Sequence, residues 1–397
     1  MDDGLVRSIS TGLSQKGVRD HNERLLLSLL QRHGAMPASD LSRRANLSPP
    51  TVSGILRRLE AEGILERGEP VRGKVGKPSV PMRLAADGAF AFGLKIGRRS
   101  AELVLIDLRG ETRHERQLTY TSPDPRDVFS FLDSSVHEIM AGMSGDLGTR
   151  ICGIGIAAPF EMWNWPDAPD ALQGAYAGWK DINLQEQAQD ITGLPVFLMN
   201  DATAACQAEH TYGRGREFHD YAYFFIGAFV GGGIVLNNSV FEGRQGNAGA
   251  LGSLRSIGPN GESMQLVDMA SIHQLELRLR EVDLNSQQLW TNPESWLSLS
   301  RYVDPWLGQT AQELAKAAMS TCSVIDFESI LIDGAFPASI RDDLINRVRR
   351  YVTTQDIRGL IPPRIEAGSV GIKARAIGAA TRPISAQFML NAKLGSA

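Results

Sequence analysis

Apolar positions near the start of the chain recur at helical spacing in three consecutive segments. A run of leucines on one helix face predicts a first helix over residues 21–33, where Asp20 followed by Glu23 fits a capping box. A second, shorter helix is expected next. Ser48 is typical of the cap of a third helix, with Pro49 at the first helical position, where proline costs least. Three short helices in this order are typical of a helix-turn-helix.

The third helix carries different residues on its two faces. Its inner face is apolar, with Val52, Ile55, Leu56 and Leu59. Small residues on the outer face let a helix enter the major groove, where hydroxyl and guanidinium groups reach bases and phosphates. We therefore predict DNA contacts from the exposed residues Ser48, Pro50, Thr51, Ser53, Gly54, Arg57 and Arg58.

A basic hairpin tip follows this helix. Residues 64–67 and 80–84 read as paired strands around the sequence RGKVGKP at 72–78. A flexible tip of this composition suits a phosphate ridge or a narrow minor groove, so we predict DNA contacts from Arg72, Lys74 and Lys77. A three-helix bundle with a solvated charged face is the alternative. Because cap, spacing, wing and local charge agree, we favour a winged helix-turn-helix DNA-binding domain over residues 1–86.

Charge divides the chain at the same place. Residues 1–83 hold 14 Lys or Arg and 9 Asp or Glu, a net charge of +5, whereas the remainder holds 27 and 36, a net charge of -9. A basic head on an acidic body indicates that only the head meets a polyanion such as double-stranded DNA.

The composition argues against disordered, fibrous, membrane-spanning and disulfide-rich proteins. Hydrophobic residues make up 43% and charged residues 22% of the 397 residues, which argues against long disorder or a fibrous fold. The longest nearly continuous apolar run, residues 222–236, is shorter than the ~20 residues of a membrane helix. Cys152, Cys206 and Cys322 lie far apart without CxxC spacing, so we expect buried thiols, no disulfide framework and a cytoplasmic location.

The body contains a weak internal repeat. Residues 90–111 and 221–243 each show three strand-like segments separated by turns, and helical and strand-like segments follow each copy. This predicts two similar α/β lobes over residues 87–205 and 206–397, with a C-terminal helix that returns to the first lobe as a further possibility. A cleft between such lobes is the natural ligand site.

Several strings resemble known sequences. LSPPTVSGILRRLEAEGIL, at 47–65, is similar to the winged helix-turn-helix of bacterial sugar-responsive repressors. The body resembles the ROK family of bacterial sugar kinases and repressors in GIGIAAP (153–159), GW (178–179), TGLP (192–195), NDATAA (200–205), GGGI (231–234), GI (371–372) and GAA (378–380). The resemblance implies a two-lobed actin-like ATPase (ribonuclease H-like) body. Family members with this head resemble the xylose and N-acetylglucosamine repressors.

The resemblance also shows which kinase chemistry is missing. Kinases of the family carry a DxGxT phosphate loop, whereas this chain has Lys95-Ile-Gly-Arg-Arg99, and a lysine cannot ligate magnesium. The second glycine-rich turn, residues 227–233, is as often structural as nucleotide-binding. The family's zinc-site residues are replaced by Ser253, Gly258, Asn260 and Gln265. We therefore expect no enzyme activity, no bound ATP, no zinc and no other cofactor.

An effector site is implied at the position of the kinase base. Asp201 matches that base and Asn200 a neighbouring sugar contact, although the pair has the alternative role of capping the helix that follows. Other family sugar contacts are replaced by Ala175, Ala250 and Val267.

Aromatic residues supply further candidates for this site. Aromatic rings stack on the apolar faces of sugars, and an acidic side chain offers a hydrogen-bond acceptor. A dimer surface is the equal alternative for Trp163 and Trp165. The predicted effector contacts are Asn200, Asp201, Trp163, Trp165, Trp179 and Glu161.

These observations predict a DNA-binding transcriptional regulator, a repressor of carbohydrate-use genes, whose body binds a sugar or polyol without phosphorylating it. Its expected partners are a double-stranded DNA operator, a carbohydrate effector and further copies of itself in a homodimer or tetramer, with no membrane. Two alternatives stay open. One is a sugar kinase with an appended DNA-binding head, and the other is a regulator that responds to a protein partner.

Overall fold

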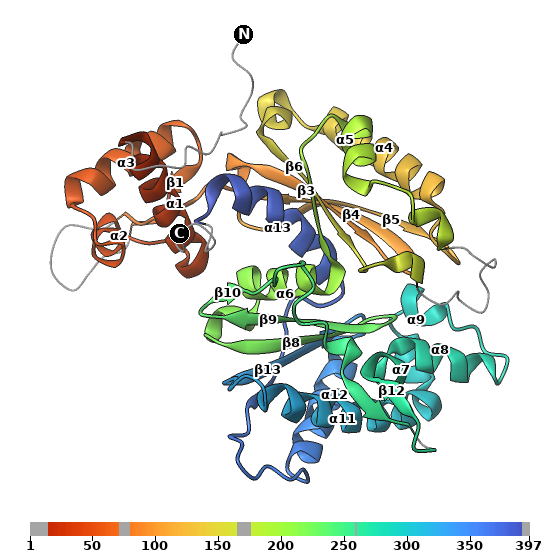
Figure 1. The fold of residues 1–397 in the computed structure, drawn as a ribbon. Coiled ribbons are helices and arrows are strands. Elements are labelled where there is room, and N and C mark those ends of the chain that lie inside the picture. Colours follow the sequence, from red (N-terminus) through yellow and green to blue (C-terminus); the bar gives the residue numbers. More distant parts are fainter. Residues whose placement is uncertain (1–14, 71–79, 165–175, 259, 391–397) are drawn as a thin grey trace. The chain divides into compact units, whose positions relative to one another are not determined.

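The N-terminal head consists of three helices and a two-stranded antiparallel hairpin (Figure 1). The computed structural model describes residues 15–70, 80–164, 176–258 and 260–390. The elements of the head are α1 (Gln15–His33), α2 (Ala38–Ala45), α3 (Pro49–Ala61), β1 (Leu65–Arg67) and β2 (Met82–Leu84). The predicted order of helices and hairpin strands is confirmed. Ser48 caps α3 and accepts a hydrogen bond from the Thr51 amide, also as predicted.

The start of α1 differs from the expectation. α1 begins at Gln15, so Asp20 lies inside the helix and does not cap it. A capping residue needs a non-helical backbone, which Asp20 lacks because the segment before it continues the helix. The capping-box prediction is therefore wrong.

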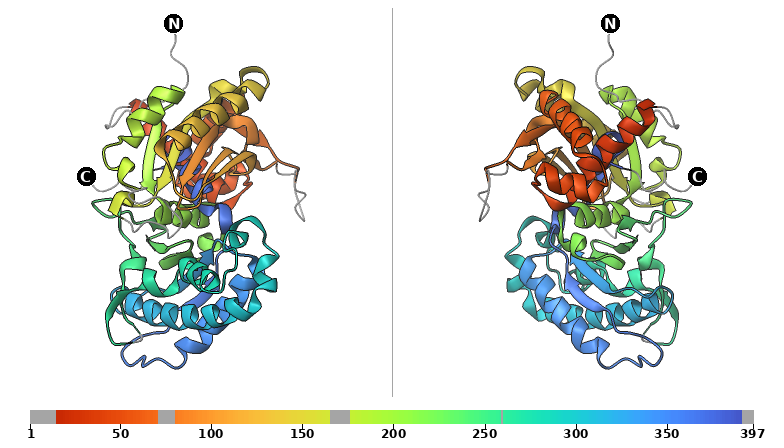
Figure 2. Two further views of the ribbon diagram at one scale, coloured as in Figure 1. Left: turned by 90° about the vertical axis from the view of Figure 1, so that its right-hand side faces the viewer. Right: turned by 90° about the vertical axis from the view of Figure 1, so that its left-hand side faces the viewer.

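Leucines and a valine from all three helices form the core of the head. Leu26 and Leu30 of α1, Leu41 of α2, and Val52 and Leu59 of α3 are each at most 2% exposed. Burying a side chain of this size contributes about 1.5–3 kcal/mol. The helices lie packed together in the right-hand view of Figure 2. This packing leaves the opposite face of α3 in solvent.

The body contains two five-stranded sheets of the same topology. Their orders are β5-β4-β3-β6-β7 and β10-β9-β8-β13-β14. In each, the first strand of the repeat pairs antiparallel with the next strand and parallel with a later one. The internal repeat is thus confirmed, although the third strand of the first copy follows the segment 90–111 instead of lying within it.

The strands of the first sheet are β3 (Phe90–Ile96), β4 (Ser100–Asp107), β5 (Thr112–Thr119), β6 (Ile151–Ala158) and β7 (Val196–Asn200). Those of the second are β8 (Tyr221–Ile226), β9 (Val230–Leu236), β10 (Ser239–Val240), β13 (Ser329–Gly334) and β14 (Arg364–Ala367). A separate hairpin consists of β11 (Arg255–Ile257) and β12 (Ser263–Gln265). The helices of the body are α4 (Pro125–Gly142), α5 (Leu184–Thr192), α6 (Asp201–Tyr212), α7 (Leu266–Ala270), α8 (Ile272–Arg280), α9 (Gln288–Thr291), α10 (Ser295–Ser298), α11 (Ser300–Cys322), α12 (Ala338–Val352) and α13 (Ala374–Phe388).

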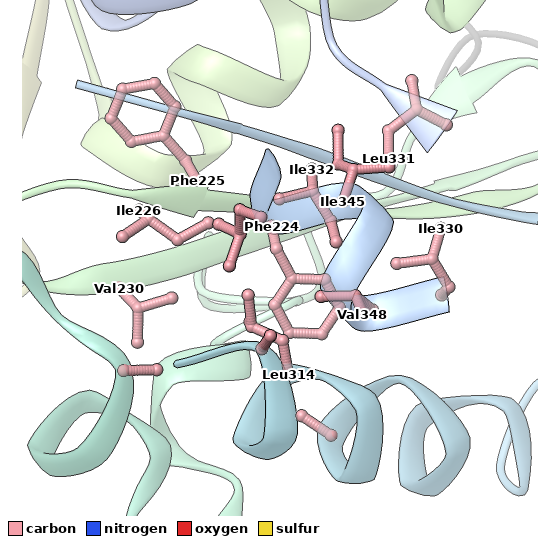
Figure 3. Close-up of a cluster of buried hydrophobic side chains, with 14 of the residues drawn as sticks. Phe224, Phe225, Ile226, Val230, Leu314, Ile330, Leu331, Ile332, Ile345 and Val348 are labelled. Atoms are coloured by element: carbon pink, nitrogen blue, oxygen red, sulfur yellow. The ribbon is translucent and has the colours of Figure 1, made fainter. Parts of the chain in front are cut away.

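Side chains of the second sheet alternate between its two faces. Figure 3 shows Phe224 of β8 directed toward Leu314 of α11 and Val348 of α12, whereas Phe225 points to the other side. Phe224, Leu314 and Val348 are all at most 1% exposed. The period-two alternation of a strand therefore buries one face of β8 under α11 and α12 and turns the next residue toward the opposite face.

The chain divides into two compact units. The first contains the head, the first sheet and the residues from Ala379 onward, and the second extends from Met199 to Gly378. The division thus falls before α6, whereas the sequence placed the lobe boundary after residue 205. α13 begins in the second unit and ends in the first. Among the described residues, no helix combines the length and the apolar character that crossing a membrane requires.

Candidate nucleic-acid interface and effector site

The outer face of α3 is exposed as the sequence predicts. Ser48, Pro50, Thr51, Ser53, Gly54 and Arg57 are all exposed, whereas the apolar residues of the opposite face are buried. The Ser48 hydroxyl also lies 2.8 Å from the Thr51 hydroxyl. An added Cβ at Gly54 would meet no atom of the described residues within 4 Å, so none of them covers this face there. The geometry fits a helix that inserts into the major groove.

Arg58, unlike the other predicted DNA contacts on this helix, is partly buried and bound to another helix. Its guanidinium forms an ion pair with Glu23 of α1, and the Glu23 side chain is only 8% exposed. Arg58 itself is partly buried, with 36% of its side chain exposed. The sequence indicated that Arg58 is important but could not show that Glu23 is its partner. The two residues lie on different helices, so no spacing pattern in the sequence connects them. In this structure Arg58 joins two helices of the head.

We expect Arg58→Ala to destabilise the head by about 2 kcal/mol, because a largely buried carboxylate loses its guanidinium partner. Hydrogen exchange of α3 amides in the full chain measures this loss. Arg43→Ala is the matched control, since Arg43 forms an exposed pair with Asp40 at 2.9 Å and should change the stability by less than about 0.5 kcal/mol. Equal exchange in the two variants would contradict a structural role for Arg58.

The base of the hairpin is fixed by ion pairs, and its tip lies outside the described residues. Arg67 of β1 binds Glu60 of α3 at 2.7 Å, and Arg83 of β2 binds Glu66 at 2.7 Å. Arg72, Lys74 and Lys77 belong to the tip, at 71–79, so their predicted DNA contacts stay predictions.

The loop that resembles a kinase phosphate loop contains a buried lysine. Lys95, at the end of β3, is 3% exposed, and its Nζ lies 2.9 Å from Glu102 Oε1 and 2.9 Å from the Ser100 hydroxyl. An added Cβ at Gly97 would lie 2.5 Å from Lys95 Cε, so the lysine side chain folds over the loop. A buried ammonium in this position does not fit a magnesium-bound nucleotide.

The second glycine-rich turn has a packing explanation. Gly231 and Gly233 of β9 face α6, where an added Cβ would lie 2.7 Å from Ala202 Cβ and 2.5 Å from Cys206 Cβ. Helix α6 therefore approaches the strand too closely for any side chain. These glycines are accounted for by helix-strand packing, which supports the structural alternative for this turn.

Asn200 and Asp201 begin α6 in two different roles. The Asn200 side chain caps the helix by accepting hydrogen bonds from the amides of Ala202 at 2.9 Å and Thr203 at 3.2 Å. Asp201 lies in the first turn, with its Oδ2 3.3 Å from Nη1 of Arg375, and its side chain is 17% exposed. The capping alternative thus describes Asn200. The carboxylate of Asp201 is held by an arginine that the sequence reasoning did not identify.

The other predicted effector contacts belong to the first unit. Trp179 is 2% exposed, its Nε1 donates to the Pro123 carbonyl at 2.8 Å, and its ring packs against Phe129. Trp179 is therefore a core residue that offers no face to a ligand, and its prediction as an effector contact is wrong. Trp163 is 37% exposed. Glu161 is exposed and accepts a hydrogen bond from Asn164 at 2.9 Å, and Trp165 lies outside the described residues.

Cysteines and metal ligands form no reactive centre in the described part of the chain. All three cysteines are free and buried, as predicted, and burial raises the pKa of Cys152 to about 12, which keeps it a neutral thiol. Within the same residues, no group of three or more His, Cys, Asp or Glu side chains has a metal-binding arrangement. The positions at which the resemblance implies zinc ligands hold residues such as Asn260 and Gln265, which are not thiolates.

The head and the body of the chain each match a different family of known proteins. Residues 19–66 match the winged helix-turn-helix DNA-binding model, and residues 91–263 match the ROK family model. The uncharacterized protein y4fQ of Sinorhizobium fredii is 24% identical over 377 residues, 94% of this chain and 92% of that protein. The xylose repressor of Bacillus subtilis is 23% identical over 240 residues, 60% of this chain and 62% of that protein. A crystal structure of a ROK family transcriptional regulator, a homologue of the E. coli MLC protein, gives a TM-score of 0.66 at 20% identity and covers 94% of this chain and 98% of that one.

The chain therefore combines a winged-helix DNA-binding head with a duplicated α/β body. Residues 91–263 of this body are similar to the ROK family model. The alignment with the xylose repressor spans less than two thirds of that relative's length.

Proposed function

We propose that this protein is a DNA-binding transcriptional regulator, a repressor of carbohydrate-use genes, whose body binds a sugar or polyol without phosphorylating it. The observation that carries the proposal is the exposed face of α3, on a head that matches the winged helix-turn-helix model. A homodimer or tetramer would present two such heads to the half-sites of an operator. The similarity to a xylose repressor supports the carbohydrate response.

The position of Lys95 argues against a kinase with an appended head. Its ammonium neutralises Glu102 inside the loop where a kinase of this family needs a carboxylate for the metal. We expect the purified protein to consume no ATP above a no-enzyme blank when it is incubated with magnesium and a panel of aldoses, amino sugars and polyols. Sugar-dependent ATP consumption that co-purifies with the chain would overturn the non-enzymatic assignment.

Asp201 supports an effector site in the second unit. Its carboxylate is partly exposed and bound to Arg375, which a sugar hydroxyl can replace as donor. Thermal unfolding across the same panel, which includes D-xylose and N-acetylglucosamine, should show a higher midpoint for at least one sugar, because a ligand that binds only the folded state stabilises it by about 2.7 kcal/mol at 100 times its Kd.

Asp201→Ala should abolish that shift and the sugar dependence of DNA binding, so that its affinity for DNA is the same with and without sugar. Glu294→Ala, at an exposed residue of the same unit, is the control and should keep the shift. A DNA affinity of Asp201→Ala that still changes with sugar would contradict the effector role of Asp201. A flat panel would favour the alternative of a protein partner, for which the exposed aromatic side chains of Phe160 and Trp163 are candidate contacts.

A further inference from the structure

Helix α13 begins next to the candidate effector residue. Arg375, in its first turn, lies 3.3 Å from Asp201 through Nη1 and Oδ2, and its guanidinium stacks 5.0 Å above the ring of Phe225. The turn that leads into α13 is held by a buried carboxylate, since the Gly371 amide donates to Asp333 Oδ2 at 2.7 Å. The start of α13 is thus anchored in the second unit through charged groups of low exposure.

Two backbone contacts lie in the middle of α13, one within each unit. An added Cβ at Gly378 would overlap the carbonyl oxygen of Ala204 in α6, and one at Gly155 of β6 would overlap the carbonyl oxygen of Ala379. Pro383 supplies no N–H to that Ala379 carbonyl. Because no side chain lies between these backbones, a shift of α13 cannot be absorbed by a change of rotamer.

The C-terminal end of α13 is bound by the DNA-binding head. Nη1 of Arg24, on α1, donates to the carbonyl of Ala386 at 3.1 Å and to that of Met389 at 3.2 Å. The Ser28 hydroxyl, one turn further along α1, accepts a hydrogen bond from the Leu390 amide at 2.9 Å. The last carbonyls of a helix lack partners within it and carry partial negative charge, so a guanidinium there is favourable.

We propose that α13 couples the occupancy of Asp201 to the position of the DNA-binding head. A ligand that takes over the carboxylate of Asp201 releases Arg375 at one end of the helix, and the backbone contacts carry the resulting shift to the end that Arg24 and Ser28 hold. The proposal rests on the proposed function in one respect, namely that the effector binds at Asp201. The route through α13 is argued only from the contacts described above and does not depend on which ligand binds.

The two arginines act here as positioning residues. Neither Arg24 nor Arg375 needs to touch DNA, because each acts through the helix to which it is bound. If the two ends of α13 are coupled, the effects of substitutions at the two ends on hydrogen exchange are not additive. The effects of substitutions at unconnected sites are additive.

Hydrogen exchange of the full-length protein, without DNA or sugar, tests this coupling. Asp201→Asn keeps the side-chain shape and removes the charge that holds Arg375. We expect amides of residues 18–33 and of the last turn of α13 to exchange about fivefold faster, the effect of losing one hydrogen bond of typical net strength. Arg24→Ala should produce the same change, and Asp201→Asn should add nothing to it.

Arg347→Ala is the matched control for a lost ion pair in the second unit. Arg347 binds Asp304 at 2.7 Å and Asp343 at 2.9 Å, and both partners lie on α11 or α12. Arg347→Ala should therefore change the hydrogen exchange of α11 and α12 only. Ser28→Ala provides a milder change on the head side if Arg24→Ala unfolds. Wild-type exchange of residues 18–33 in Asp201→Asn, an equal response to Arg347→Ala, or additive effects would each overturn the coupling.

The hydrogen-exchange experiment and the sugar panel can fail independently of each other. A positive exchange result with a flat sugar panel would keep the coupling and refute the carbohydrate effector. A sugar response with unchanged exchange in Asp201→Asn would keep the effector and refute the route through α13.

Discussion

Gly378→Ala is expected to destabilise the protein by about 3 kcal/mol or more, because the added methyl group would overlap a backbone carbonyl of α6. In an exposed helix the same change stabilises by roughly 0.5–1 kcal/mol, so the sign itself is diagnostic. For a unit of this size the loss corresponds to a thermal midpoint lower by about 10 °C. Differential scanning calorimetry of the full chain measures the midpoint.

Gly142→Ala is the control for this change. Gly142 ends α4, and an added Cβ there would meet nothing within 4 Å. The control should move the midpoint by no more than about 2 °C, in either direction. A Gly378→Ala protein that unfolds at the wild-type temperature would contradict the direct backbone contact between α13 and α6.

Gly54→Glu should weaken DNA binding about 100-fold while the head stays folded. The new carboxylate would project from the outer face of α3, where it occupies the space of the groove and repels the phosphates. Because no atom of the part of the chain that the structure describes lies within 4 Å of an added Cβ, and because the residue is helical, the side chain fits the unbound head without strain. Binding to a labelled duplex at about 0.15 M salt, followed by fluorescence anisotropy, measures the change.

Gly54→Ala separates size from charge at the same position. It should stabilise α3 by up to about 1 kcal/mol and weaken DNA binding much less than glutamate does. If Gly54→Glu bound DNA as tightly as the wild type, α3 would not be the recognition helix. Unchanged circular dichroism in both variants confirms that the head remains folded.

Local patterns predicted the head well. Ser48 and Pro49 at the start of α3 and the buried Val52 and Leu59 are set by residues within one turn of each other, and the structure has them as expected. The start of α1 was missed because Asp20 and Glu23 satisfy a capping pattern that a longer helix overrides.

Contacts between distant segments could not be predicted. Arg375 and Asp201 are 174 residues apart, and Arg24 and Ala386 are 362 apart, so no spacing rule connects them. Trp179 has the aromatic character of a sugar-binding residue, but the fold places it in the core. Family resemblance identified Asp201, whereas only the structure shows that its carboxylate is bound to α13.

Selection of bound duplexes from a pool of random DNA, with the full-length wild type and Gly54→Glu in parallel, tests the central claim most directly. The account predicts that the wild type enriches one sequence, bound at least about 1,000-fold tighter than random DNA at physiological salt, and that Gly54→Glu enriches none. A wild-type protein that enriches no sequence, or that enriches the same one as Gly54→Glu, would contradict the assignment as a DNA-binding regulator.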